Sequence, residues 1–429
     1  MDIIGIIAGG LFCFGYFLIA LERKFSTNKS AIALMMAGIL WMLAAIQAHG
    51  SKHLTEVADK TAVDVFGVVA FTLASMALIE ILVHYHFFDW VRLQLLRLHL
   101  NDRAQFALMI GITFMISGVL DNISLTIAMI QVARRFFSGK NLLIVACAIV
   151  IASNGGGAWS PVGDVTSLLL WLSGKVTAWE LISTAFLPTV GLVATAGFLL
   201  YRQLDPKDFL PHKISEEKIV FSLSEKVVIA SALFSFVLPL IVNTFGVPPY
   251  LGRLFGLGFT WACIEFARTK SHTRHKSHLT ANIEMLVQKI DIASVEFIMG
   301  ILLSVGALTS IGVLAYISQV AVGTHPSEAW VITLGSLLGL MSGIVDNSAL
   351  MAISLKVFPI TDPALWGLIS ITTGTGGSLL IFASAAGIVA MGSLKELTFQ
   401  QYLKIGSFPA LAGLIVGVCI WFIQNRLIL

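Results

Sequence analysis

Charged residues are scarce in this 429-residue sequence, where Asp, Glu, Lys and Arg together make up 12%. Soluble domains typically have about 25%. Hydrophobic residues make up 57% of the chain, and the net charge of +3 creates no long-range basic field. This composition excludes a soluble enzyme, a disordered protein and a nucleic-acid-binding protein. It predicts an all-α polytopic membrane protein whose main partner is the lipid bilayer, with no nucleic-acid partner.

Cysteines are also few, and the four present are Cys13, Cys147, Cys263 and Cys419. Each lies in an apolar run and none has C-x-x-C spacing, so we expect neither a disulfide framework nor a thiolate metal site. We interpret them as small buried apolar residues. No Lys or Arg precedes the first apolar run, so we expect no cleaved signal or transit peptide. We also expect no cofactor, and a carrier instead of an enzyme.

Long apolar segments dominate the rest of the chain. A membrane-spanning helix needs about 20 apolar residues. Uninterrupted runs of this kind occur at 3–21, 31–48, 63–83, 178–201, 226–243, 250–267, 291–318 and 403–425. Four further regions are apolar but contain Asp, Asn, Gly, Ser and Thr: 104–133, 141–173, 329–358 and 364–392. Irregular backbone at membrane depth is tolerated only where protein or a water-filled cavity surrounds it. These four regions therefore predict an ion-accessible site.

The irregular regions form two matching pairs. The sequence S-G-V-L-D-N at 117–122 is repeated as S-G-I-V-D-N at 342–347. Each is followed by a glycine-rich segment, S-N-G-G-G-A-W-S-P-V-G-D at 153–164 and T-G-T-G-G-S at 373–378. The same elements in the same order indicate an internal duplication.

We interpret each D-N pair as the tip of a re-entrant helical hairpin, and each glycine-rich segment as the break in the spanning helix that follows. The predicted units are a first repeat at 1–205, a cytoplasmic linker at 206–223 and a second repeat at 224–429. The first contains a hairpin at 104–133 and a broken helix at 141–173; the second contains a hairpin at 329–358 and a broken helix at 364–392. Five crossings per unit make the second repeat inverted relative to the first.

The basic residues support this topology. With the N-terminus outside, 21 of the 27 Lys and Arg residues fall in segments on the inner side, and the other six, Arg253 among them, fall on the outer side. Such an excess is typical of cytoplasmic segments. Basic residues flank both ends of the first hairpin, which places both ends on the inner side, whereas the second hairpin has few flanking charges and is expected to enter from outside.

Three acids lie at predicted membrane depth: Asp121, Asp164 and Asp346. A charged side chain there costs about 2.5–3.5 kcal/mol on insertion scales. Each Asp precedes a helical segment and could serve only as an N-cap, but Asn or Ser would cap without a buried charge. We therefore predict that the three acids bind a small hard cation. Further oxygen ligands come from amides and hydroxyls: Asn122, Asn154, Asn347, Ser117, Ser124, Thr166, Ser342, Thr375 and Ser378.

Other polar residues have more than one interpretation. Glu296 and Glu80 are candidate proton-relay groups, although either could reach the interface or pair with a basic neighbour. His272, His275 and His278 suggest a solvated basic loop more than a metal site or pH sensor. The amphipathic stretch 89–100 is expected to lie along the inner interface.

The two D-N motifs and the A-W-S-P-V-G-D segment resemble those of the NhaD-type sodium/proton antiporters. The segment A-S-A-A-G at 383–387 fits the same resemblance. It covers nearly the whole chain, and the family belongs to a superfamily that also contains arsenite and dicarboxylate carriers. The resemblance implies inverted repeats, an elevator-like movement of the hairpin domain, and transport roles for the residues at the matching positions: Asp121, Asn122, Asn154, Asp164, Thr166, Asp346 and Asn347.

We therefore expect exchange of Na⁺ for H⁺ across a bacterial cytoplasmic membrane, with Li⁺ as a second cation and a homodimer as the oligomer. Two alternatives remain open. A sodium-coupled dicarboxylate symporter resembles this architecture but has Ser-Asn-Thr at its hairpin tips. An arsenite-type efflux carrier requires an ATPase partner or proton coupling.

Overall fold

The computed structural model describes residues 1–20, 28–48, 52–98, 100–205, 219–270 and 288–428, and these residues form helices and short connections without strands. Seven helical stretches are long and apolar enough to cross a membrane: Lys29–Ala48, Leu54–His84, Gly139–Trp159, Ala178–Tyr201, Leu223–Asn243, Ile292–Ile311 and Phe399–Leu427. The protein is therefore an all-α, multi-pass membrane protein, as the composition predicted.

The helices of the first half are α1 (Ile3–Ala20), α3 (Lys29–Ala48), α4 (Lys52–His84), α5 (Phe87–Arg97), α6 (Asp102–Ser117), α7 (Asn122–Ala133), α8 (Gly139–Trp159), α9 (Val165–Leu172) and α10 (Ala178–Tyr201). Those of the second half are α11 (Leu223–Asn243), α12 (Pro249–Lys270), α14 (Ile292–Ile311), α15 (Val313–Ile317), η3 (Ser318–Val322), α16 (Glu328–Met341), α17 (Asn347–Val357), α18 (Pro363–Gly376), α19 (Ala385–Ser393), α20 (Phe399–Tyr402), η4 (Leu403–Ser407), α21 (Phe408–Phe422) and η5 (Ile423–Ile428).

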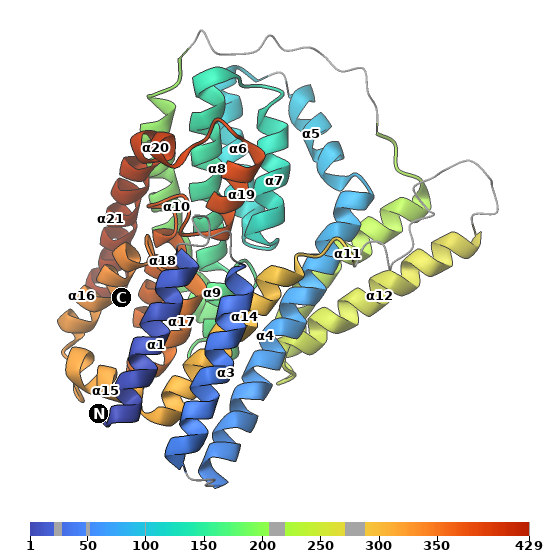
Figure 1. Ribbon diagram of the computed structural model, residues 1–429. Coiled ribbons are helices and arrows are strands. Elements are labelled where there is room, and N and C mark those ends of the chain that lie inside the picture. Colours follow the sequence, from blue (N-terminus) through green and yellow to red (C-terminus); the bar gives the residue numbers. More distant parts are fainter. Residues whose placement is uncertain (21–27, 49–51, 99, 206–218, 271–287, 429) are drawn as a thin grey trace.

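The four irregular regions each become two helices joined by a short connection. These pairs are α6 with α7, α8 with α9, α16 with α17, and α18 with α19. Figure 1 shows α6 and α7 in the upper part of the molecule and α16 and α17 lower down, with α9 at about the height of α16. The N-terminus lies at the lower left of this view, and the C-terminus lies higher on the same side, beside α16.

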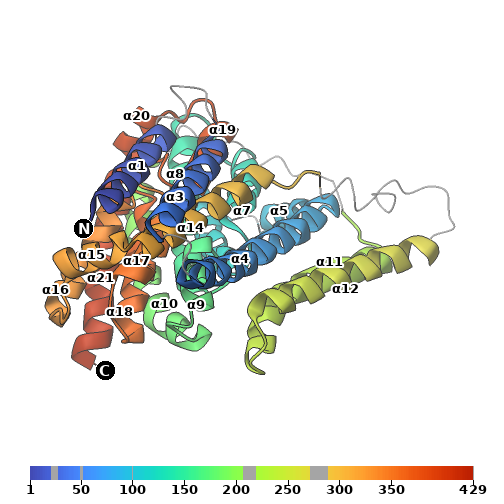
Figure 2. The ribbon, with the colours of Figure 1, turned by 60° about the horizontal axis from the view of Figure 1, so that its bottom comes forward.

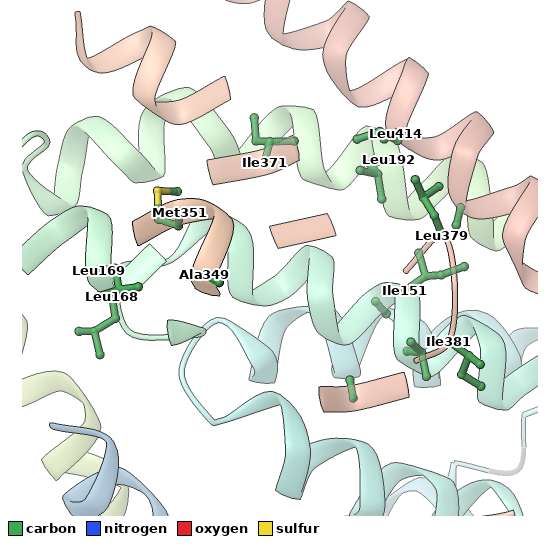
Figure 3. Packing of buried hydrophobic residues seen from close by; sticks show 14 of the residues in the cluster. Ile151, Leu168, Leu169, Leu192, Ala349, Met351, Ile371, Leu379, Ile381 and Leu414 are labelled. Atoms are coloured by element: carbon green, nitrogen blue, oxygen red, sulfur yellow. The ribbon is translucent and has the colours of Figure 1, made fainter. Parts of the chain in front are cut away.

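Two helices, α8 and α18, form the centre of the hydrophobic core. Almost every residue of α8 from Ile144 to Ala158 is buried, as is nearly all of α18. They contact each other, and α8 is also covered by α6, α7 and α10. Figure 3 shows the surrounding apolar packing, in which Ile151 of α8, Leu192 of α10 and Leu414 of α21 come together from distant parts of the sequence.

Helices α11 and α12 form a pair at one flank, beside α4 (Figure 2). They approach closely because Gly252 and Gly256 of α12 face Ser235 and Pro239 of α11: a Cβ atom at Gly256 would lie 2.5 Å from the Ser235 Cβ. Small residues four positions apart are typical of tight contacts between membrane helices.

Arg253 lies between these two glycines and is fully buried, whereas the charge count had assigned it to an outer segment. Proline has no N–H, so Pro239 leaves the carbonyl of Ser235 without its helical partner. Arg253 Nη1 donates to that carbonyl at 3.3 Å. Its guanidinium also lies 4.4 Å from the ring centroid of Phe71 and 4.5 Å from that of Phe236. These contacts explain how a charged residue is retained inside a helix pair.

Three sequence expectations need correction. The run 291–318 is not one helix, because α14 ends at Ile311 and Gly312 has a left-handed φ of 87°. Of the four cysteines only Cys147 is buried, while Cys13 and Cys419 are exposed on outward-facing surfaces. The third concerns the glycine-rich segments and is described with the site.

The predicted histidine loop (His272, His275, His278) and most of the linker 206–223 lie outside the described residues. The amphipathic stretch 89–100 does form a helix over most of its length, as part of α5.

Candidate functional site

The two D-N motifs occupy equivalent positions, each at the start of the second helix of its pair. Asp121 is the N-cap of α7, where its carboxylate accepts from the backbone N–H groups of Ile123 and Ser124 at 3.1 and 3.2 Å. Asp346 is the N-cap of α17 and accepts from Ser348 and Ala349 at 3.0 and 3.4 Å. Capping is thus a real role of both acids, and it holds each carboxylate at the junction between two helices.

The second helix of each broken pair, α9 and α19, begins at an N-cap residue, and the two N-caps differ in charge. Asp164 caps α9 by accepting from the N–H of Val165 at 2.8 Å. At the corresponding position Ser384 caps α19, accepting from Gly387 at 3.2 Å. Ser384 was not among the predicted site residues, although it lies in the A-S-A-A-G segment that carried part of the resemblance. The second half therefore presents a neutral hydroxyl where the first presents a carboxylate.

Hydrogen bonds between buried polar groups bind the first helix pair to the first broken helix. The Ser117 hydroxyl lies 2.5 Å from Asn122 Oδ1 and 2.6 Å from the Ser153 carbonyl oxygen. Ser153 Oγ in turn donates to the Asn122 carbonyl at 3.3 Å. The second half repeats the central contact, because the Ser342 hydroxyl donates to the carbonyl of Thr373 at 2.6 Å. Ser117 and Ser342, both predicted site residues, thus have the same structural role in the two halves.

The two halves are joined directly at the site. Asn347 Nδ2 donates to Asp164 Oδ2 at 3.1 Å, which connects the second D-N motif to the first helix break. Asn154 Nδ2 donates to the hydroxyls of Ser378 and Ser384 at 2.8 and 3.0 Å, which connects the first break to the second. These bonds span more than 180 positions of sequence, and together with the bonds of Ser117 and Asn122 to Ser153 they bring all four irregular regions into one place.

We call the residues that meet there the polar junction: Ser117, Asp121, Asn122, Ser153, Asn154, Asp164, Thr166, Ser342, Asp346, Asn347, Ser378 and Ser384. Asp164 lies within electrostatic range of both Asp121 and Asp346. In the described residues, however, no three carboxylate, imidazole or thiol groups converge on one point. A cation at this junction would therefore be coordinated by a carboxylate together with amide, hydroxyl and free carbonyl oxygens, which are the ligands that broken membrane helices offer to small hard cations.

One buried hydroxyl in the junction lies beside the Asp164 carboxylate. Thr166 is fully buried, and its Oγ1 approaches that carboxylate without forming a hydrogen bond of ordinary geometry. A buried polar atom whose hydrogen bonding is incomplete is costly, and Thr166 follows the Asp164 cap by only two positions. A cation bound at the Asp164 carboxylate would have this oxygen within reach.

The remaining predicted site residues have fewer contacts with the polar junction, or none. The N–H of Ser124 donates to Asp121, while the Thr375 hydroxyl donates within its own helix to Ile371 at 2.6 Å. Glu80 on α4 lies within electrostatic range of Lys289, and Glu296 lies on α14. Both glutamates belong to the described residues, and neither forms a hydrogen bond with the polar junction.

Each helix ends inside its predicted glycine-rich segment, but most of the glycines themselves stay helical. Gly155, Gly156 and Gly157 lie inside α8, and the chain leaves the helix only after Trp159; Gly374 and Gly376 likewise lie inside α18. Their role is close approach. A Cβ at Gly156 would lie 2.3 Å from the Phe114 carbonyl oxygen of α6, and one at Gly376 would lie 2.1 Å from the Gly339 carbonyl oxygen of α16. A Cβ at Gly157 would lie 3.0 Å from the Asn122 amide nitrogen and 2.7 Å from the Asp164 Cβ.

We expect Gly156→Ala to destabilise the protein by about 1–3 kcal/mol, because backbone atoms cannot move aside for the new methyl group. Gly111→Ala on α6 is the matched control, since a Cβ there meets nothing within 4 Å. It should stabilise the helix by roughly 0.5–1 kcal/mol. Thermal unfolding of the purified variants in detergent measures both effects, and a Gly156→Ala variant as stable as the control would contradict the packing role.

The helical membrane architecture and the buried oxygen-lined junction are typical of a membrane transporter. A family model described as "Citrate transporter" matches residues 16–387. The chain belongs to this family. Similar curated proteins include Sodium/proton antiporter 2 of Arabidopsis thaliana, 32% identical over 95% of this chain and 97% of its own length. Sodium/proton antiporter 1 of the same plant is 31% identical, over 97% of this chain and 72% of its own. The Na(+)/H(+) antiporter NhaD of Vibrio cholerae is 28% identical, over 99% and 92%.

Proposed function

We propose that this protein exchanges sodium for protons across the membrane, with the polar junction as the shared binding site. The observation that carries the proposal is the placement of Asp164. Its carboxylate caps α9, accepts from Asn347 of the other half, and lies beside the buried Thr166 hydroxyl. The plant and bacterial relatives named as sodium/proton antiporters support the same reaction.

Exchange follows from the chemistry of a carboxylate at membrane depth. Sodium binds the ionised oxygen atoms, and a proton occupies the same atoms, so the two cations compete. A carboxylate that carries neither ion is a bare charge, which is costly to move through the membrane interior. The site therefore crosses loaded with sodium or with protons, and each crossing in one direction is balanced by the other ion. Lithium, which is also small and hard, is proposed as a second substrate.

We further propose that the two halves are inverted repeats, 1–205 and 224–429. The equivalent capping of α7 and α17 and the matching bonds of Ser117 and Ser342 support a duplicated unit. The positions of the two helix pairs at opposite levels in Figure 1 agree with opposite orientations. The excess of basic residues in the predicted inner segments supports an N-terminus on the outer side, and the bacterial relatives support a cytoplasmic membrane. A homodimer remains a proposal from the sequence alone.

A citrate or dicarboxylate carrier is the second candidate, because the family is described by its citrate-transporting members. A polycarboxylate anion would have to bind beside Asp121, Asp164 and Asp346, and Coulomb repulsion opposes this. Both predicted hairpin tips also carry Asp-Asn, whereas the dicarboxylate symporters have Ser-Asn-Thr there. We therefore favour the cation.

Everted membrane vesicles from a strain without its own sodium/proton antiporters test the choice. The vesicles are acidified inside by respiration, and a quenched pH-sensitive dye reports the gradient. We expect sodium and lithium to restore fluorescence in vesicles that contain the protein, and potassium and citrate to have no effect. Vesicles from the empty-vector strain are the control. Dequenching by citrate but not by sodium chloride would favour the second candidate.

A further inference from the structure

The two helix breaks, between α8 and α9 and between α18 and α19, occupy equivalent places in the two halves. A Cβ at Gly157 would lie 2.7 Å from the Asp164 Cβ, and one at Gly377 would lie 3.0 Å from the Ser384 Cβ. Each of these two cap residues also accepts a hydrogen bond from an asparagine of the other half. Asp164 and Ser384 are therefore matched residues of one repeated arrangement.

The helices that close the two halves are matched in the same way. Helix α10 and the run from α20 to α21 each begin with a capping box, at Thr177 and at Thr398. Counting from these caps gives the corresponding residues, which are Leu181 with Tyr402 and Phe186 with Ser407. The second half thus has hydroxyl groups at two positions where the first half has apolar side chains.

Both hydroxyl groups donate to the backbone of the second break. The Tyr402 hydroxyl, which is fully buried, donates to the Ser378 carbonyl at 2.7 Å. The Ser407 hydroxyl donates to the Leu379 carbonyl at 2.6 Å. The next carbonyl, that of Leu380, accepts from a backbone N–H within the break at 3.0 Å. Three successive carbonyl oxygens of the second break are thus already hydrogen-bonded within the protein.

The first break has no corresponding donors. The ring centroid of Phe186 lies 5.0 Å from that of Trp159, so the position that holds a hydroxyl in the second half holds an aromatic contact here. In the part of the chain that the structure describes, no side chain donates to a carbonyl of residues 159–163, and the Ser160 carbonyl accepts from the N–H of Gly163 at 3.3 Å. Carbonyl oxygens of this break therefore remain available beside the Asp164 cap.

Charge differs between the breaks in the same direction. Asp164 gives the first break a carboxylate, whereas Ser384 leaves the second break with a neutral cap. The Asp346 carboxylate accepts from two N–H groups of α17, and the next residue, Asn347, donates to Asp164 at 3.1 Å. The second D-N motif therefore also reaches the first break. Small hard cations bind where ionised oxygens and free carbonyls meet, and the first break offers both kinds of ligand.

We propose that each chain binds one sodium ion, at the first helix break, and that Tyr402 and Ser407 close the second break to cations. This assignment rests on the exchange function proposed above, and it defines which part of the polar junction holds sodium. Tyr402 and Ser407 act as positioning residues, because their hydroxyl groups occupy the carbonyl oxygens that the second break would otherwise offer. Sodium then has one place to bind, although the chain contains two equivalent breaks.

The number of sodium ions bound per chain tests this inference. Purified full-length protein should bind one ion per chain in equilibrium dialysis against saturating radioactive sodium at alkaline pH. Exchange in everted vesicles should depend on the sodium concentration hyperbolically, without cooperativity. Two ions per chain would overturn the inference and leave sodium–proton exchange intact. A protein that neither binds nor moves sodium would overturn the proposed function itself.

A variant with a carboxylate in the second break tests the role of Tyr402. In Ser384→Asp the new side chain lies where Asn154 Nδ2 and the N–H of Gly387 already donate, at 3.0 and 3.2 Å, so the site accommodates an acceptor. In this background Tyr402→Phe frees the Ser378 carbonyl, and we expect the combined variant to bind two sodium ions per chain.

Tyr250→Phe in the same background is the matched control, because the Tyr250 ring packs against Phe66 at the flank of the molecule, with 5.7 Å between ring centroids. It should bind one sodium ion per chain. Size-exclusion chromatography checks that each variant is folded. One ion in the folded Tyr402→Phe combination, or two in the control, would overturn the role of the Tyr402 hydroxyl.

Discussion

Replacement of Asp164 by asparagine is expected to abolish sodium–proton exchange while the protein still folds and inserts. Asparagine is also a good N-cap, so the N–H of Val165 keeps its acceptor. What disappears is the charge that attracts sodium and the oxygen that carries the proton. A single charge pair at about 4 Å is worth roughly 4 kcal/mol at an effective dielectric constant of 20, so we expect a loss of more than about 100-fold. Dequenching in everted vesicles measures the rate, and the protein amount is checked by immunoblot.

Two comparisons separate charge from capping. Asp2→Asn is the matched control, because Asp2 caps α1 through the N–H of Gly5 at 2.8 Å and lies far from the polar junction in sequence. It should leave exchange unchanged. Asp121→Asn and Asp346→Asn should also lose exchange, since both acids cap a helix in the same manner within electrostatic range of Asp164. Near-normal exchange in Asp164→Asn would show that the carboxylate serves only as a cap, and it would remove Asp164 from the site.

Sodium binding to the purified protein should release protons, and its apparent affinity should weaken as the pH falls. Both effects follow from competition at one set of carboxylate oxygens. If each sodium displaces one proton, linkage predicts a change in apparent affinity of about tenfold per pH unit in the range where the protonated form dominates. The carboxylates interact with one another, so the titration belongs to the group and not to one residue.

Isothermal titration calorimetry in two buffers of different ionisation enthalpy measures the number of protons released per sodium bound. Lithium should behave as sodium does, and Asp164→Asn should release fewer protons. Sodium affinity that stays constant over the acidic range, with no proton release, would favour sodium-coupled symport over exchange.

The local features of the site could be predicted from the sequence because they depend on neighbouring residues. An acid placed directly before an apolar helical segment caps that helix wherever the chain goes, so Asp121, Asp164 and Asp346 were placed correctly at helix starts. Helix bounds follow for the same reason: α6 with α7 and α18 with α19 agree with the predicted regions to within two residues. The duplication of the D-N motif could also be recognised from the sequence alone, because comparing the two segments requires no knowledge of their tertiary contacts.

The contacts between the halves were decided by the tertiary structure. No local sequence pattern predicts the bonds of Asn347 to Asp164 or of Asn154 to Ser378 and Ser384. These bonds join distant segments that the packing of α8 against α18 brings together. The glycines were misread for a related reason. Glycine lowers helix propensity locally, which predicts a break, but at Gly156 and Gly376 the backbone of a neighbouring helix occupies the place of a side chain. Arg253 was counted among the charges of the outer segments. Its partners, the Ser235 carbonyl and the rings of Phe71 and Phe236, lie on other helices, and only packing brings them together.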